Sequence, residues 1–169
     1  RDVAETPVFG ALAFVDAAGL RGVEHAVVDG QFAEQGIRCA LRVERGHAVE
    51  ARLNAEDPDR DFAPAPGRIA YLDFPNGPGI RVDTGVGEGD SIPADFDSMI
   101  AKIIAYGVDR DEALGRLRRA MSETTVVVEG GATNKSFVLD LLDQPEVIDG
   151  SADTGWIDRV RGEGRLVSE

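Results

Sequence analysis

Apolar and polar side chains alternate from residue 47 to residue 56, and this period of two is the strongest constraint on the fold. The apolar face of the segment carries His47, Val49, Ala51, Leu53 and Ala55. The opposite face carries Ala48, Glu50, Arg52, Asn54 and Glu56. Successive side chains of a β-strand point to opposite faces, so the pattern predicts a strand that is buried on one face only. Pro58 then ends the segment, because proline has no amide hydrogen to donate to a β-ladder.

Two further segments with strand character follow, at residues 68–74 (RIAYLDF) and 80–86 (IRVDTGV). The turn sequence PAPG (64–67) precedes the first, and PNGPG (75–79) separates the two as a tight reversal with Asn-Gly chemistry. The β-branched run TTVVV at 124–128 predicts another strand. Together these segments indicate a sheet that is mainly antiparallel.

The spacing changes after residue 94, where apolar side chains begin to recur every three or four residues. In the segment 95–107 they are Phe96, Met99, Ile100, Ile103 and Ile104. This spacing is typical of one face of an amphipathic helix. We therefore expect a helix here, capped near Asp95 or Asp97 and stopped by Gly107.

A second helix is predicted at 109–121, where Asp109 and Glu112 resemble the two residues of a capping box. A third helix is predicted at 133–143, and the pattern weakens after Pro145. Strands that are followed by helices indicate the α+β class. The expected architecture is a mainly antiparallel sheet with helices packed on one of its faces.

The charge of the chain argues against two classes of partner. The sequence has 31 acidic and 18 basic residues and a formal net charge of −13, which would repel nucleic-acid phosphates and anionic lipids. It contains no run of about 18 apolar residues that would span a membrane. We therefore expect a cytoplasmic protein that binds neither nucleic acid nor membrane. The single cysteine, Cys39, allows no intrachain disulfide, and a small buried side chain is favoured over a reactive thiol.

Arg81 is the residue that most strongly suggests a binding site. It lies on the polar face of the strand predicted at 80–86, between Gly79 and Gly85, and glycines at such positions permit close approach of a ligand or another backbone. The guanidinium group offers a planar fork of donors that suits carboxylate-like anions. The other interpretation is a surface arginine that pairs across the sheet, for example with Glu50.

Other polar motifs are weaker candidates. Glu50, Glu56, Asp57 and Asp59 form an acidic group, but they lack the spacing of an EF-hand and a histidine, so a structural turn is favoured over a metal site. The segment GVGEGD (85–90) lacks the Gly-Lys-Ser or Gly-Lys-Thr of a phosphate-binding loop, so a flexible loop is favoured.

The two histidines add little. His47 lies on the apolar strand face and is expected to be partly buried with its hydrogen bonds satisfied. Glu24 and His25 would act as an acid/base pair only if the fold placed them in a cleft. The residues by themselves therefore predict an α+β domain with one candidate anion-binding arginine, no metal site and no complete active site.

Three long segments are distinctive, and in chain order they are RGHAVEARLNAEDPDRDFAPAPGRI, GIRVDTGVGEGDSIPADFDSMIAKIIAYGVDRDEALGRLRRAM and GGATNKSFVLDLL. Together they resemble the C-terminal domain of biotin carboxylase, the ATP-grasp component of biotin-dependent carboxylases. The resemblance covers residues 45–145, and the following LLDQPEVIDGSADTGWIDR is also similar to the carboxylase ending. It implies a C-terminal domain at 45–160, a remnant or shortened end of the ATP-grasp region at 1–44, and a tail at 161–169.

The resemblance implies a reaction in which ATP activates bicarbonate to carboxyphosphate and a ureido nitrogen of biotin captures the released CO2. Arg81 matches the family arginine that binds bicarbonate and stabilises the biotin enolate, so it would be both a binding and a catalytic residue. The implied cofactors are ATP with Mg or Mn, and biotin on a carrier domain, and none is expected to bind this chain alone. The motifs look most like those of acyl-CoA carboxylases, which belong to fatty acid metabolism.

The implied partners are the ATP-grasp domain, a biotin carboxyl carrier domain and a carboxyltransferase. The resemblance also implies a homo-oligomer, with the segment around Tyr106 and Arg110 near a dimer interface.

The first 44 residues depart from the family pattern. Val23-Glu24-His25 matches the segment whose glutamate is the general base, so Glu24 is the candidate base. The metal-binding glutamate and asparagine, the arginine beside them and the nucleotide-binding lysines have no counterpart. The chain is therefore expected to be part of a larger ATP-dependent ligase and inactive alone. The alternative is a degenerate, non-catalytic module that serves as a scaffold or dimerisation domain in a carboxylase complex.

Overall fold

The computed structural model describes residues 12–13, 45–93 and 97–163. The strands are β1 (Leu12–Ala13), β2 (His47–Asn54), β3 (Glu56–Asp57), β4 (Ala63–Pro64), β5 (Gly67–Asp73), β6 (Ile80–Thr84), β7 (Ser91–Ile92), β8 (Met99–Gly107) and β9 (Thr125–Glu129). The α-helices are α1 (Arg110–Glu123), α2 (Lys135–Leu141), α3 (Pro145–Asp149) and α4 (Trp156–Gly162), and a 3-10 turn, Pro58–Arg60, follows β3. The predictions for Glu24, His25 and Cys39 lie outside the described residues.

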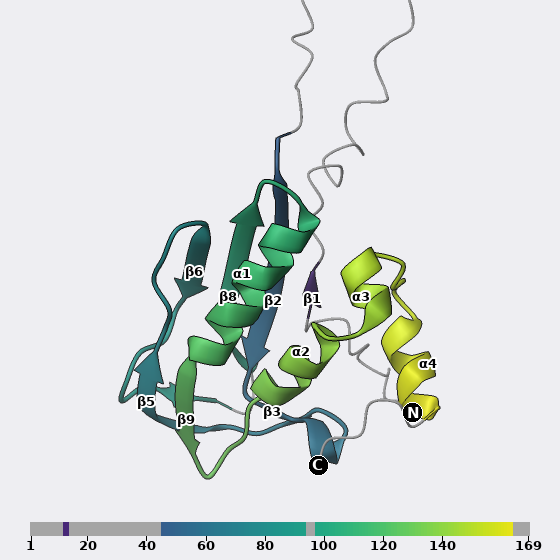
Figure 1. The fold of residues 1–169 in the computed structure, drawn as a ribbon. Helices are drawn as coiled ribbons and strands as arrows, with labels where there is room; N and C mark the ends of the chain where they lie inside the picture. Colours follow the sequence, from purple (N-terminus) through teal and green to yellow (C-terminus); the bar gives the residue numbers. More distant parts are fainter. Residues whose placement is uncertain (1–11, 14–44, 94–96, 164–169) are drawn as a thin grey trace, which may run out of the picture.

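Helices cover one face of an antiparallel sheet (Figure 1). The larger sheet has the strand order β1-β2-β8-β6, and a second sheet has the order β7-β5-β9. Neighbouring strands in both sheets are antiparallel. α1 packs on β8 and β2, and α2 packs beside it against β2. The predicted α+β class, with a mainly antiparallel sheet and helices on one face, is confirmed.

The helix predicted at 95–107 is wrong, because β8 is a central strand between β2 and β6. Ile100 lies where the register between β2 and β8 shifts, and it has no partner on β2. After this bulge the side chains alternate, and the buried ones are Ala101, Ile103 and Ala105. Ile100 is thus an extra residue in the strand. With it, apolar side chains stand at 99, 100, 103 and 104, which is also the spacing of one face of a helix. Pairing with a strand on each side decides the conformation.

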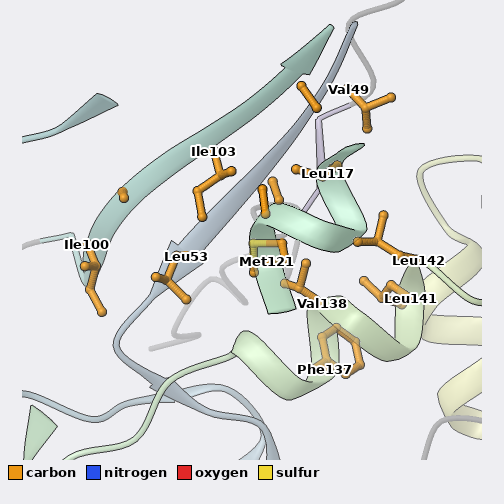
Figure 2. Packing of buried hydrophobic residues seen from close by; sticks show 14 of the residues in the cluster. Val49, Leu53, Ile100, Ile103, Leu117, Met121, Phe137, Val138, Leu141 and Leu142 are labelled. Atoms are coloured by element: carbon orange, nitrogen blue, oxygen red, sulfur yellow. The ribbon is translucent and has the colours of Figure 1, made fainter. Parts of the chain in front are cut away.

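The apolar face predicted for the first long strand is confirmed. Val49 and Leu53 of β2 are fully buried, as are Leu117 and Met121 of α1, which pack over them (Figure 2). The α2 side chains that complete this cluster are Phe137, Val138 and Leu141. The core is therefore a sheet–helix layer built mainly from aliphatic side chains.

The capping pair predicted at the start of α1 is also confirmed. The Asp109 carboxylate accepts a hydrogen bond from the Glu112 backbone N–H at 2.9 Å, and the Glu112 carboxylate accepts one from the Val108 N–H at 2.6 Å. These bonds satisfy amides near the helix N-terminus that have no partner within the helix.

Two helices after residue 144 were not predicted. α3 begins at Pro145, which suits the first helical position, and ends at Asp149, with Gly150 as the C-cap at a φ of 80°. The buried side chains of α3 and α4 are Val147, Trp156 and Val160.

Arg110 donates hydrogen bonds to the carbonyl groups of α3 at Val147 and Ile148, which ties α3 to the first turn of α1. α4 reaches Gly162 and so extends into the segment interpreted as a tail, of which residues 164–169 are not described.

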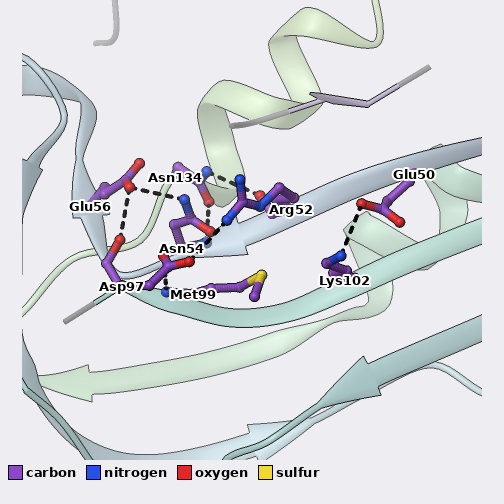
Figure 3. Close-up of polar contacts among 9 residues, drawn as sticks. Glu50, Arg52, Asn54, Glu56, Asp97, Met99, Lys102 and Asn134 are labelled. Carbon is purple, nitrogen blue, oxygen red and sulfur yellow. Dashed lines mark hydrogen bonds and ion pairs between the residues drawn. The ribbon is translucent and has the colours of Figure 1, made fainter. Parts of the chain in front are cut away.

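A buried asparagine, Asn134, joins the start of α2 to the end of β2 (Figure 3). Its side-chain oxygen accepts a hydrogen bond from the Asn54 backbone N–H at 2.9 Å, and its side-chain amide donates to the Arg52 carbonyl at 3.2 Å. The Asn54 side chain donates in turn to Glu56, which also accepts a bond from Ser98. Asn134 therefore pairs with the β2 backbone where the strand ends.

The reversal at 75–79 does not close a hairpin, since β5 and β6 belong to different sheets. At its end, Gly79 has a φ of 75°, and an added Cβ would lie 2.6 Å from the Tyr106 carbonyl oxygen on β8. Gly130 provides a comparison, because it has a φ of 74° but open space around its Cα.

We expect Gly130→Ala to lower the free energy of unfolding by about 1–2 kcal/mol through left-handed backbone strain. Gly79→Ala should lower it by roughly 2 kcal/mol more, because the backbone must also move away from Tyr106. Urea denaturation of the two variants measures the difference. Equal losses would contradict the close approach of Gly79 to β8.

Candidate functional site

The face of the larger sheet opposite α1 carries charged side chains in two rows that run across the strands. Directly opposed residues on neighbouring antiparallel strands share a face. The first row has Glu50 and Arg81 at its two ends, with the uncharged Ile104 between them. The second row is Arg52, Lys102 and Asp83. The outer strand β6 thus places the predicted site arginine beside an aspartate, two residues further along the same strand.

Arg81 is held by Asp83 and not by the expected surface partner. Its Nε donates to Asp83 Oδ1 and its Nη2 donates to Asp83 Oδ2, both at 2.8 Å, so the pair is bidentate. The Arg81 side chain is 73% exposed and the Asp83 side chain 42% exposed. An exposed arginine in an ion pair agrees in part with the surface interpretation, and the active-site role of Arg81 stays a prediction.

Glu50, the partner suggested from the sequence, lies near Lys102 instead. The two charged groups are 3.9 Å apart, and only 15% of the Glu50 side chain is exposed (Figure 3). In the second row Arg52 pairs with Asp97 at 3.1 Å. The face therefore carries both acids and bases, so neither sign of charge dominates it.

The pKa of Asp83 is lowered from its ordinary value of 3.8, chiefly by the hydrogen bonds from Arg81 and further by the positive charges of Arg81 and Lys102. The pKa of Arg81 is raised by the same hydrogen bonds. A depressed carboxyl pKa means that the pair stabilises the fold above the ordinary pKa of aspartate. This stabilisation is lost as the pH falls through the lowered value. Both groups are therefore charged at neutral pH.

Two acids of the motif at 50–59 take part in local hydrogen bonds. Asp57 caps the 3-10 turn by accepting a hydrogen bond from the Asp59 N–H, and Glu56 belongs to the network of Asn134. Within the described ranges, no group of three or more His, Cys, Asp or Glu residues is arranged to hold a metal ion.

The other two weaker motifs also have structural partners. In the glycine-rich segment 85–90, the Gly87 N–H donates to the Asp90 carboxylate, which forms a turn. His47 is partly buried, and its Nε2 lies 3.1 Å from Nη1 of Arg110, which confirms a partly buried imidazole with a hydrogen-bond partner.

Sequence reasoning missed Lys102 as a member of this face, because it placed residue 102 on a helix. It also overlooked Asp83 as the partner of Arg81. The period of two within 80–86 already put Arg81 and Asp83 on one side of the strand. That spacing was the available signal for the pair.

Comparison with known proteins identifies the class. Residues 50–159 match the family described as the biotin carboxylase C-terminal domain. A biotin carboxylase from Nostoc is 42% identical over 127 residues, which are 73% of this chain and 28% of the relative. The alpha3 subunit of a biotin-dependent acyl-coenzyme A carboxylase from Mycobacterium leprae is 44% identical over 117 residues, covering 67% of this chain and 19% of the relative.

A solved structure agrees with this assignment. It is the biotin carboxylase domain dimer of the Hydrogenobacter thermophilus 2-oxoglutarate carboxylase, in complex with MgADP and bicarbonate. The TM-score is 0.66 at 31% sequence identity, and the match covers 69% of this chain and 25% of that one. The chain therefore belongs to the biotin carboxylase C-terminal domain family.

The chain spans only 28% of the length of the Nostoc relative. Among the residues that the structure describes, no helix is both long and apolar enough to cross a membrane.

Proposed function

We propose that this chain is the C-terminal domain of a complete biotin carboxylase and forms one side of its active site. In that enzyme, ATP and bicarbonate would be used to carboxylate biotin on a carrier domain. The observation that carries the proposal is the position of Arg81. In a chain of this family, Arg81 lies on the outer strand β6, and its side chain is 73% exposed and uses two of its guanidinium nitrogens to bind Asp83.

Arg81 would bind bicarbonate and stabilise the negative charge that develops on biotin. A fixed cation beside a developing oxyanion lowers a barrier by several kcal/mol, because it needs little reorganisation during the reaction. The similar carboxylase domain from Hydrogenobacter thermophilus is a complex with bicarbonate, which supports this class of ligand.

The metal and nucleotide would be held by other parts of the enzyme. The described residues offer no arrangement of acids and histidines that fits Mg or Mn. Glu24 remains the proposed general base, and it lies outside the described residues.

The segment around Tyr106 and Arg110, where β8 ends and α1 begins, is proposed as the surface that meets a second copy. The Val108 side chain beside them is 75% exposed, and Tyr106 and Ile148 are also exposed apolar side chains. Burying such side chains in an interface is favourable. The similar Hydrogenobacter domain is a dimer.

We propose an acyl-CoA carboxylase as the parent enzyme, which would place it in fatty acid metabolism. The Mycobacterium leprae relative supports this assignment by its similarity. The carboxyl acceptor itself would be selected by the carboxyltransferase, because the described residues belong to the biotin carboxylase component.

The 169-residue chain alone is expected to show no ATP hydrolysis that depends on bicarbonate and biotin. The physical reason is that one side of a site cannot hold nucleotide, metal and bicarbonate together. A coupled ADP-release assay, with a complete biotin carboxylase as the positive control, tests this. Bicarbonate-dependent hydrolysis above background would contradict the proposed division of the site.

A further inference from the structure

Asp83 occupies one particular edge of the Arg81 guanidinium group. A guanidinium carries five N–H groups: one on Nε and two on each terminal nitrogen. Asp83 binds the side edge, through Nε and one hydrogen of Nη2. Of the three remaining hydrogens, one on Nη1 and one on Nη2 form the end edge of the group. That edge has the spacing of a second bidentate fork for a carboxylate-like anion.

The geometry also limits how Arg81 moves. An exposed arginine has several rotatable bonds and loses considerable rotamer entropy when it is fixed. The two 2.8 Å bonds to Asp83 hold the plane of the guanidinium group relative to the sheet. Because Asp83 is on the same strand, this restraint exists before any ligand arrives.

Asp83 is itself supported from the neighbouring strand. Lys102 on β8 is directly opposite Asp83 in the register, and its charge helps to keep the Asp83 pKa low. The carboxylate is thus ionised at every pH near neutrality. The hydrogen bonds from Arg81 to Asp83 therefore persist over the pH range in which bicarbonate predominates.

We propose that Asp83 is the positioning residue of Arg81: it takes the side edge of the guanidinium group and leaves the end edge oriented for bicarbonate. This inference rests on the proposed function, since it presumes that Arg81 binds that anion. Asp83 does not touch the substrate. It acts by keeping the donors in one orientation, which matters because small misplacements of a binding group are costly in catalysis.

The kinetic test uses the complete carboxylase with Asp83→Asn, Asp83→Glu and Glu129→Gln. Glu129 is the matched control, because it is a strand acid paired with an exposed arginine, Arg68, in the other sheet. We expect Asp83→Asn to lower kcat/KM for bicarbonate by roughly 10- to 100-fold while KM for ATP is unchanged. Asp83→Glu keeps the carboxylate and should recover most of the loss, and Glu129→Gln should behave as wild type.

A second measurement uses the chain itself and does not depend on turnover. In an NMR spectrum with 15N-labelled arginine, the Arg81 Nε–H should show a high heteronuclear NOE that falls in Asp83→Asn but not in Glu129→Gln. An Arg81 signal that is already mobile in the wild-type chain would overturn the inference.

The two proposals fail in different ways. If Arg81→Ala abolishes carboxylation but Asp83→Asn matches wild type, the positioning role is wrong and the proposed function stands. If Arg81→Ala has no effect on turnover, the role of Arg81 in the proposed function is wrong. Equal rises in KM for ATP and for bicarbonate in Asp83→Asn would indicate a general structural defect and would also overturn the positioning role.

Discussion

Arg81→Ala is expected to lower biotin carboxylation by the complete enzyme by about 10²- to 10³-fold, the usual cost of removing one preorganised electrostatic contact at a reacting centre. Arg81→Lys should be intermediate, because lysine keeps the charge but loses the planar fork. The fold should be unaffected, since the Arg81 side chain is 73% exposed and its single described ion pair is with Asp83 on the same strand.

The matched control for this experiment is Arg68→Ala. Arg68 is another exposed strand arginine with a carboxylate partner, Glu129, at 3.6 Å, but it lies in the other sheet. Turnover is measured as biotin-dependent ADP release, and the melting temperature of each variant checks the fold. Normal turnover in Arg81→Ala would refute its catalytic role and favour the alternative of a scaffold module.

Asn134→Ala is expected to lower the free energy of unfolding by about 3 kcal/mol. The Asn134 side chain is fully buried and serves both the Asn54 N–H and the Arg52 carbonyl. Its removal leaves these two backbone groups of β2 without their partner, and each unsatisfied buried group costs about 1–3 kcal/mol. A cavity adds to the loss. Urea denaturation monitored by the fluorescence of Trp156, a buried tryptophan, measures it.

Ser122→Ala is the control for this variant. Ser122 is exposed and its hydroxyl donates to the Arg118 carbonyl within α1, so its removal should change stability by no more than about 0.5 kcal/mol. A loss below about 1 kcal/mol in Asn134→Ala would mean that water replaces its hydrogen bonds. The bonds to β2 would then not hold α2 in place.

Local patterns predicted the elements whose determinants lie within one segment. The alternation of His47 to Asn54 identified β2 and its buried face, and Asp109 with Glu112 identified the start of α1. Both rest on interactions between residues a few positions apart. Of the candidate site, the sequence predicted Arg81 and its place on the polar face of a strand.

The remaining features depend on contacts between distant residues. β8 has helical spacing in its sequence, yet it is a strand because β2 and β6 pair with it on both sides. The 75–79 reversal has the chemistry of a hairpin turn, yet it connects strands of two different sheets. Periodicity within one segment carries no information about such pairings, because the partners can be 60 residues apart in the chain, as with His47 and Gly107.

The sequence by itself therefore determined the class of the fold and the family resemblance, and it singled out Arg81 as the predicted anion-binding residue. Only the tertiary structure decided which partner holds that residue. The sequence suggested Glu50 across the sheet, whereas the structure pairs Arg81 with Asp83 on its own strand. The insertion of β8 between β2 and β6 separates Arg81 from Glu50 by a whole strand and gives Glu50 to Lys102. Asp83 remains within reach, because side chains two residues apart on a strand lie on the same face.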